Sequence, residues 1–101
     1  MAIILQFDFP YAGPWGEAYT EALRELAKSI AAEPGLIWKA WTENAAEGLA
    51  GGIYYFEDEQ SALAYRDMHI RRLASFGVQD FRAKVFHVNE ALSAITGFKN
   101  A

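Results

Sequence analysis

The sequence predicts an α+β domain of the ferredoxin-like type, with the element order β-α-β-β-α-β. Apolar residues alternate with period two in four segments, recur at helical spacing in two others, and are separated by Gly and Pro. This order builds one antiparallel four-stranded sheet with two helices on one face. Because 101 residues suffice for only one hydrophobic core, we expect a single domain over residues 1–101.

A change of period separates the first strand from the first helix. Residues Ala2 to Phe9 alternate apolar and polar positions, as a strand with one apolar face does. Pro and Gly residues at positions 10–14 then interrupt the chain. The next apolar positions recur at helical spacing up to Pro34 and Gly35, at Tyr19, Leu23, Leu26, Ala27 and Ile30.

A β-hairpin follows the first helix. Leu36 to Glu43 is the expected second strand, Asn44 to Leu49 a polar loop, and Gly51 to Phe56 the third strand, which is rich in Tyr and Ile. The Gly51-Gly52 pair has no helix after it, so a bulge or a tight strand entry explains it better than a phosphate-binding loop does.

The second half of the chain repeats the order helix, strand. Acidic residues at positions 58–59 favour a helix start, and Gly77 marks its end. The apolar stripe of this helix consists of Ala62, Tyr65, His69, Leu73 and Phe76. Phe81 to Val88 returns to strand alternation, and the segment from Glu90 onward is short and weakly helical.

The face of the sheet that the helices leave open predicts a homodimer. Trp38 and Trp41 lie three residues apart in one strand, so alternation sends them to opposite faces. Since the other strands also carry apolar residues on both sides, a monomer would expose a large apolar patch. We therefore expect two sheets to pack face to face.

Composition excludes several classes of function. The net charge is −4, with positive charges scattered along the chain, so nucleic acid is not an expected partner. With no Cys and two His the sequence offers no metal site, and no bound cofactor is expected. The N-terminal AIILQFDF has no basic region or cleavage site and is too short to span a bilayer, which predicts a cytoplasmic protein without a membrane partner.

Three segments resemble the YdhR family of small mono-oxygenases. They are EPGLIWKAWTE from Glu33, AGGIYYFEDEQSALAY from Ala50 and AKVFHVNEALSAI from Ala83, and the similarity runs from the first strand to the C-terminal segment. The resemblance implies a dimeric α+β barrel. It also implies a likeness to cofactor-free mono-oxygenases that oxidise aromatic polyketides or quinols with dioxygen.

Aromatic residues are the expected walls of a ligand pocket between the sheet and the helices. The chain contains 15 aromatic residues, a composition that suits a flat, largely apolar ligand held by stacking and burial. By alternation Trp38 shares a face with Leu36, whereas Tyr54 shares one with Phe56, and the sequence leaves open which face meets the helices. The candidate substrate-binding residues are Trp38, Tyr54, Tyr65, Phe7 and Phe86, with Phe9 beside them. Alternatively, these side chains fill the core and the dimer interface.

His69 is the candidate catalytic residue. It follows Tyr65 by four residues on the apolar stripe of the second helix, and both can face one pocket. Cofactor-free oxygenation requires a deprotonated substrate, and a histidine with a pKa near neutrality is a suitable base. The alternative is a structural histidine at the helix edge. His87, on the last strand, has a weaker case.

Several basic residues have structural interpretations. Lys39 is expected either to pair with an acidic residue at the barrel rim or to extend past Trp41 to solvent. Arg66, Arg71 and Arg72 give the second helix a basic side, which is usually a solvated face.

The sequence therefore supports two functional hypotheses. The leading one is a cofactor-independent mono-oxygenase that acts with dioxygen on a small phenolic or quinol-like aromatic, with His69 as base. The second is a non-catalytic dimeric module that binds an apolar metabolite. Dioxygen consumption distinguishes them.

Overall fold

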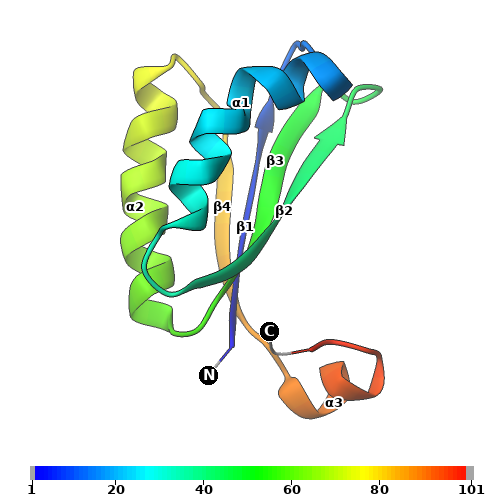
Figure 1. The fold of residues 1–101 in the computed structure, drawn as a ribbon, viewed down its shortest axis with the longest axis vertical. Helices are drawn as coiled ribbons and strands as arrows, with labels where there is room; N and C mark the ends of the chain where they lie inside the picture. The colour runs from blue at the N-terminus through cyan, green and yellow to red at the C-terminus, as the bar shows by residue number, and fades with distance from the viewer. Residues whose placement is uncertain (1, 100–101) are drawn as a thin grey trace.

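The structure is a computed structural model that describes residues 2–99. Seven elements follow one another along the chain (Figure 1). They are β1 (Ile3–Pro10), α1 (Gly16–Ala31), β2 (Leu36–Asn44), β3 (Leu49–Phe56), α2 (Glu59–Ser75), β4 (Arg82–His87) and α3 (Glu90–Ile95). The predicted order β-α-β-β-α-β is confirmed, and the weakly helical C-terminal segment forms α3.

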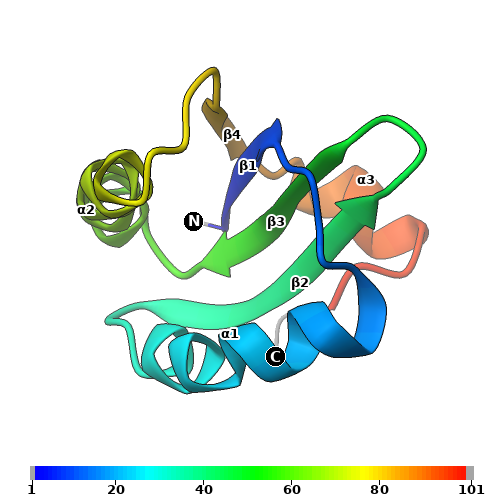
Figure 2. The ribbon, with the colours of Figure 1, turned by 90° about the horizontal axis from the view of Figure 1, so that it is seen from above.

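The four strands form one antiparallel sheet in the order β2-β3-β1-β4. Strand β1 lies in the middle, where it pairs with β3 on one side and with β4 on the other. Seen from above, α1 and α2 cover the same face of the twisted sheet, α1 beside β2 and α2 beside β1 (Figure 2). This is the predicted ferredoxin-like arrangement.

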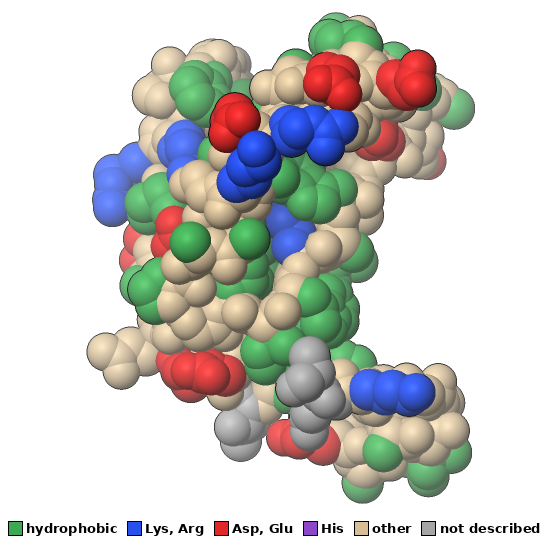
Figure 3. Space-filling model, in the orientation of Figure 1, with side chains coloured by type: hydrophobic (Ala, Val, Ile, Leu, Met, Phe, Trp, Pro, Cys, Tyr) green, Lys and Arg blue, Asp and Glu red, His purple; other side chains and the backbone are tan. Residues whose placement is uncertain are grey.

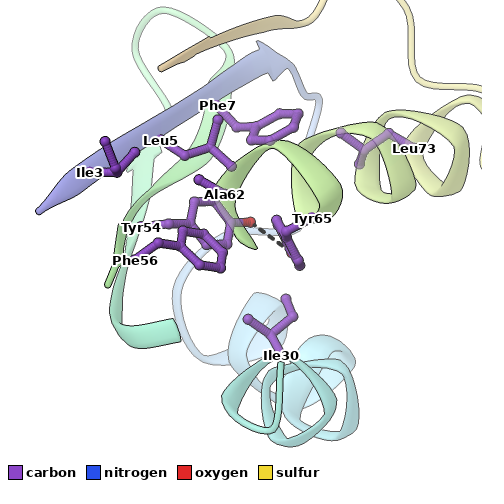
Figure 4. Packing of buried hydrophobic residues seen from close by; sticks show 9 residues of the cluster. All are labelled: Ile3, Leu5, Phe7, Ile30, Tyr54, Phe56, Ala62, Tyr65 and Leu73. Carbon is purple, nitrogen blue, oxygen red and sulfur yellow. Dashed lines mark hydrogen bonds between the residues drawn. The ribbon is translucent and has the colours of Figure 1, made fainter. Parts of the chain in front are cut away.

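The hydrophobic core lies between that face and the two helices (Figure 4). From the sheet it takes alternate residues of β1 and β3, and from the helices it takes apolar residues at helical spacing. The core residues are Ile3, Leu5, Phe7, Ile30, Tyr54, Phe56, Ala62, Tyr65 and Leu73. These residues anchor the surfaces from which the candidate site is built.

A β-bulge in β2 changes the expected phase of alternation. Leu36 pairs with Phe56, whereas Trp38 pairs with Tyr55, so the register shifts between Leu36 and Trp38. An irregularity of this kind moves the following side chains to the other face. Leu36 therefore packs against the core, while Trp38 lies on the open face, and the expectation that the two share a face is wrong. The predicted separation of Trp38 from Trp41 is confirmed, because Trp41 pairs with Gly52.

Helix α2 has a well-defined cap at each end. The Asp58 side chain accepts a hydrogen bond from the Ser61 amide at 2.7 Å, which satisfies one of the free N–H groups of the first turn. At the other end Gly77 has φ +81°, and the Val78 amide donates to the Leu73 carbonyl at 3.0 Å in a Schellman arrangement. The predicted ends of this helix are thus confirmed. The hairpin loop is shorter than predicted, because β3 begins at Leu49.

The C-terminal segment projects from the body of the domain. Figure 3 shows α3 as a separate lobe, with the outline hollowed between it and the β2–β3 loop at the opposite end. Leu92 and Ile95 of α3 are 63% and 81% exposed, although Phe98 returns to the open face of the sheet, where its ring lies 5.0 Å from that of Tyr55. None of the helices within residues 2–99 has the length and apolar character needed to cross a membrane.

Candidate functional site

A cavity of about 590 Å³ lies between the helix-covered face of the sheet and the two helices. Strand β1 and strand β3 form its floor, α1 and α2 form its sides, and the segment of residues 76–80 lies at its rim. Its lining includes Phe7, Phe9, Tyr19, Leu23, Leu26, Lys39, Trp41, Tyr54, His69, Leu73 and Asp80. The walls are thus largely aromatic and aliphatic, with a few polar groups among them.

The structure places three of the six predicted site residues in the lining. Phe7, Tyr54 and His69 line the cavity, and their rings pack against one another, with centroids 5.0 Å apart for Phe7 and His69 and 6.0 Å apart for Phe7 and Tyr54. Tyr65 lies directly behind them, with its ring stacked on His69 at 5.2 Å. These four residues therefore form one cluster.

Trp38 and Phe86 lie elsewhere. Tyr55 pairs with both Trp38 and Ile4, and Ile4 pairs with Phe86, so all four side chains share the open face of the sheet. Phe86 is 48% exposed there. The structure brings neither residue to the cavity, because the sheet separates both from it. For Trp38 the cause is the bulge in β2, which turns its side chain to the open face.

A chain of hydrogen bonds connects the tyrosines of the cluster to Arg72. The Arg72 Nη2 group donates to the Tyr65 hydroxyl, which in turn donates to the Tyr54 hydroxyl, with each distance 3.2 Å. Burial raises the pKa of both tyrosines above the usual value of a phenol. Both hydroxyls thus remain protonated at neutral pH.

His69 is a neutral imidazole in this environment. The Arg72 Nε–H donates to His69 Nδ1 at 3.1 Å, and since a guanidinium has no acceptor, Nδ1 must be the acceptor and Nε2 must carry the proton. Burial, then the charges of Arg72 and Lys39, lower the pKa of His69 to about 3. This geometry favours hydrogen-bond donation from Nε2 over the role of base that the sequence suggested.

Lys39 enters the cavity from β2. Its ammonium nitrogen lies 3.2 Å from the centre of the Trp41 ring and 4.5 Å from the centre of the Tyr54 ring. Burial, followed by the charge of Arg72, lowers the pKa of Lys39 to about 7. The expected ion pair with a carboxylate at the rim is absent among the described residues, and the side chain packs against Trp41 inside the cavity.

Gly52 makes room for the lysine. A Cβ atom at this position would lie 2.5 Å from Lys39 Cε and 3.4 Å from Lys39 Nζ. Gly51 serves a different purpose, since a Cβ there would collide with the Phe7 carbonyl of the neighbouring strand. Both glycines lie inside regular β3, and neither the predicted bulge nor a strand entry occurs at them.

Sequence reasoning missed three residues of the site as functional groups: Lys39, Trp41 and Arg72. Arg72 was expected on a solvated face, yet it binds His69 and Tyr65. A usable signal existed for Arg72, because it follows His69 by three positions and Tyr65 by seven and so lies on the same side of α2. For Lys39 the signal was a cation whose side chain passes over Gly52, the direct strand partner of Trp41, and this neighbour can be recognised only once the register of β2 against β3 is known.

Within residues 2–99 no three His, Asp or Glu side chains gather in a way that could hold a metal ion.

The fold and the cavity together define a small ferredoxin-like α+β domain with an aromatic pocket beneath its two helices. The family model described as "Putative mono-oxygenase ydhR" matches residues 4–98, and the chain belongs to this family. Among solved structures it is similar to one titled as a putative antibiotic biosynthesis monooxygenase from Deinococcus radiodurans. The two share 15% identity over 88% of this chain and 93% of that one, with a TM-score of 0.55, a likeness of fold. No curated protein matches the chain.

Proposed function

We propose that this protein is a mono-oxygenase that oxidises a small phenolic or quinol-like aromatic with dioxygen and without a bound cofactor. The observation that carries the proposal is the cavity in which aromatic walls surround Lys39, His69 and Tyr54. Membership of the mono-oxygenase family supports the reaction class. The geometry of the cavity supports the substrate class.

The size and shape of the cavity suit a small aromatic molecule. A volume of about 590 Å³ lies within the range of small-ligand sites, roughly 300 to 1,000 Å³. Trp41, which is 36% exposed, offers aromatic surface for a flat ligand, and the buried Phe7 and Tyr54 rings form the floor behind it. A planar ring with one or two hydroxyl groups matches this combination of surfaces.

The reaction balances without an external reductant. A phenol with a free para carbon reacts with one dioxygen to give a para-quinone and one water. The phenol O–H and para C–H bonds break, one C–O bond forms at the para carbon, the O–O bond breaks, and the second oxygen leaves as water with both hydrogens. The substrate supplies all four electrons, and it reacts as the phenolate because that form passes an electron to dioxygen more readily than the neutral phenol does.

Two neutral groups of the site are suited to donate hydrogen bonds to substrate oxygens. His69 carries its proton on Nε2, which makes no hydrogen bond within residues 2–99. Since every buried side-chain nitrogen and oxygen in these residues has a partner, Nε2 is accessible, and His69 lines the cavity. The Tyr54 hydroxyl accepts from Tyr65, and no hydrogen bond within residues 2–99 uses its own proton, which a small movement of the ring would bring to a ligand. Preorganised donors of this kind stabilise the negative charge that develops on oxygen during the reaction.

We also propose that the protein acts as a homodimer joined through the open faces of two sheets. Trp38, Tyr55 and Phe86 lie on this face, and the projecting helix α3 carries the exposed apolar residues Leu92 and Ile95. A second copy of the chain is the partner that would cover both. In this arrangement Trp38 and Phe86 serve the interface, and the cavity remains on the outer side of each sheet.

Dioxygen uptake by the purified protein tests the proposed function. A panel of phenols and quinols is added singly, with heat-treated protein and the His69→Ala variant alongside. Saturable uptake with one substrate class, reduced in His69→Ala by about a hundredfold, is the expected result. Saturable binding of the same compounds without dioxygen uptake would select the binding module instead.

A further inference from the structure

We propose that Lys39 is a catalytic residue of this site: it takes the proton of the substrate's hydroxyl group and then holds the resulting phenolate as an ion pair. The inference rests on the proposed function, since it specifies how that reaction begins. It replaces His69 as the base and assigns the substrate to a defined class, aromatic compounds that bind as oxyanions.

The first argument is the position of the ammonium group. The Lys39 stem crosses Gly52, and its nitrogen lies against the faces of Trp41 and Tyr54 inside the cavity lining. The bare backbone of Gly52 leaves the space that this stem fills. The side chain is therefore held in the cavity at a place where a ligand ring and its hydroxyl group would also lie.

The second argument is the missing counter-ion. Four other basic side chains have a carboxylate within ion-pair distance, for example Arg82 with Asp8 at 2.9 Å. Three basic side chains without a carboxylate partner are exposed to water: Arg71, Lys84 and Lys99. Arg72 also lacks a carboxylate partner, but it donates hydrogen bonds to His69 and Tyr65. Lys39 is half-buried, and no ion pair joins it to a carboxylate among the described residues. A partly buried ammonium is costly without a partner, and an anionic ligand would supply one.

The charge of the whole site agrees with an anionic ligand. The groups that face Lys39 come from α1, α2, β3 and the segment after α2, namely Tyr19, Arg72, His69, Tyr54 and Asp80. Of these, Arg72 is positive, the tyrosines and His69 are neutral at pH 7, and Asp80 forms no ion pair with Lys39. Positive charge near the inner end of the cavity therefore comes from Arg72, behind His69 and Tyr65, and from the protonated fraction of Lys39, whereas Asp80 lies in the segment at the rim.

The proton balance follows from these positions. Because the pKa of Lys39 is lowered to about 7, a large fraction of its side chain is a neutral amine at neutral pH. The amine lone pair takes the phenol proton, the O–H bond breaks, and the electron pair remains on oxygen beside the new ammonium. The ammonium returns this proton to the oxygen that leaves as water, which regenerates the amine.

Binding of 4-nitrophenol tests the inference directly, because its phenol and phenolate forms absorb at different wavelengths. The bound probe is titrated with pH in the wild type, in Lys39→Met and in the control Lys84→Met, which removes an exposed lysine of β4. We expect wild type and control to bind the phenolate at least about tenfold more tightly than the phenol, which lowers the pKa of the probe by about one unit. Lys39→Met should abolish this preference.

Three results would overturn the inference: a wild type that binds the neutral phenol preferentially, a wild type that does not bind the probe, or a Lys39→Met variant that keeps the preference for phenolate. If Lys39→Met does not fold, the wild type alone decides. The chain has four lysines, and NMR of their labelled Cε groups should show one with a pKa near 7 that shifts when 4-nitrophenol is added. Four lysines with ordinary pKa values, or no shift on addition, would contradict the proposal.

The same variant separates this inference from the proposed function. Phenolate-selective binding that depends on Lys39, without dioxygen uptake on any phenol, supports the ion pair between Lys39 and the phenolate and removes the oxygenase. Dioxygen uptake that is unchanged in Lys39→Met supports the oxygenase and removes Lys39 as base.

Discussion

The ammonium nitrogen of Lys39 lies 3.2 Å from the centre of the Trp41 ring, two residues further along the same strand. Residues i and i+2 of a strand point to the same face, so the pairing follows from the pleat of β2. It places the cation against an aromatic wall inside the cavity. The cation–π contact compensates in part for the hydration that the Lys39 ammonium loses on burial. A bound anion would stabilise the same charge further.

Lys39 should make the stability of the protein depend on pH above neutrality. Its pKa is lowered to about 7 in the folded protein, against 10.5 for an ordinary lysine. Between these values the unfolded chain binds more protons than the native one, so the free energy of unfolding should rise with pH over this interval. Urea unfolding from about pH 7 to 9 measures this slope, which Lys39→Met should remove and Lys84→Met should keep. An identical slope in Lys39→Met would contradict the prediction.

His69 should make the protein sensitive to mild acid. Its pKa is lowered to about 3 from 6.5, so stability is lost as pH falls through the interval between these values, where the unfolded chain takes up the proton. In His69→Gln the amide oxygen can still accept from Arg72, but the side chain does not titrate. We expect this variant to show a smaller loss of unfolding free energy between about pH 6.5 and 4. A loss equal to that of the wild type would rule out the buried neutral imidazole.

The two glycines of β3 should respond differently to substitution by alanine. In Gly51→Ala the new Cβ meets the Phe7 carbonyl, which the sheet holds in place, so a clear fall in Tm is expected. In Gly52→Ala it meets the end of the flexible Lys39 side chain, which can move away, and it lies 3.2 Å from the Ala40 carbonyl, a milder contact than the one at Gly51. That variant should keep most of its stability but lose phenolate binding. Measurement of Tm and of 4-nitrophenol affinity in both variants checks this. If both variants lose Tm and affinity to the same extent, Gly52 is not specifically needed to leave space for Lys39.

The hydroxyl of Tyr65 should stabilise the core through its two hydrogen bonds. Tyr65→Phe removes the donor to Tyr54 and the acceptor for Arg72, and it leaves a polar group in a buried place without its partner. Such losses cost about 1–3 kcal/mol. Urea unfolding measures the difference, with the partly exposed Tyr11→Phe as a less sensitive comparison because its hydroxyl makes no hydrogen bond within residues 2–99. A Tyr65→Phe variant as stable as the wild type would show that the bond network is not needed.

The open face of the sheet should join two copies of the chain. Phe86 is 48% exposed on this face, so Phe86→Glu would place a charge within the proposed interface. Sedimentation equilibrium at micromolar concentration should give a dimer for the wild type and a weaker dimer or a monomer for Phe86→Glu. Glu21→Gln on exposed α1 is a control that should leave the dimer intact. A wild-type monomer would remove the homodimer proposal.

The order of the elements was accessible from the sequence because periods of 2 and 3.6 residues are local properties. The stripe that contains Tyr65, His69 and Leu73 predicted the buried side of α2, and Gly77 predicted its end. The β-bulge between Leu36 and Trp38 was not accessible, since it depends on how β2 meets β3. It reversed the expected neighbours of Trp38 and moved that residue away from the candidate pocket.

The chemistry of the site was harder to predict than its walls. Phe7, Tyr54 and His69 were identified because their residue types and their positions on apolar stripes can be recognised from the sequence alone. Lys39 and Arg72 resemble ordinary surface cations in the sequence. The spacing within α2 gave a signal for Arg72, but the role of Lys39 depends on desolvation and on its contact with Tyr54 of β3, which no spacing along the chain encodes.

Isotope labelling during turnover is the sharpest test of the proposed mono-oxygenase reaction. The protein is incubated under ¹⁸O₂ with a phenol whose para position is free, and the quinone product is analysed by mass spectrometry. A mono-oxygenase should place one labelled oxygen atom in each product molecule and release the other in water. Product that carries no label, or the absence of any product above the heat-treated control across the panel of phenols, would contradict the proposed reaction.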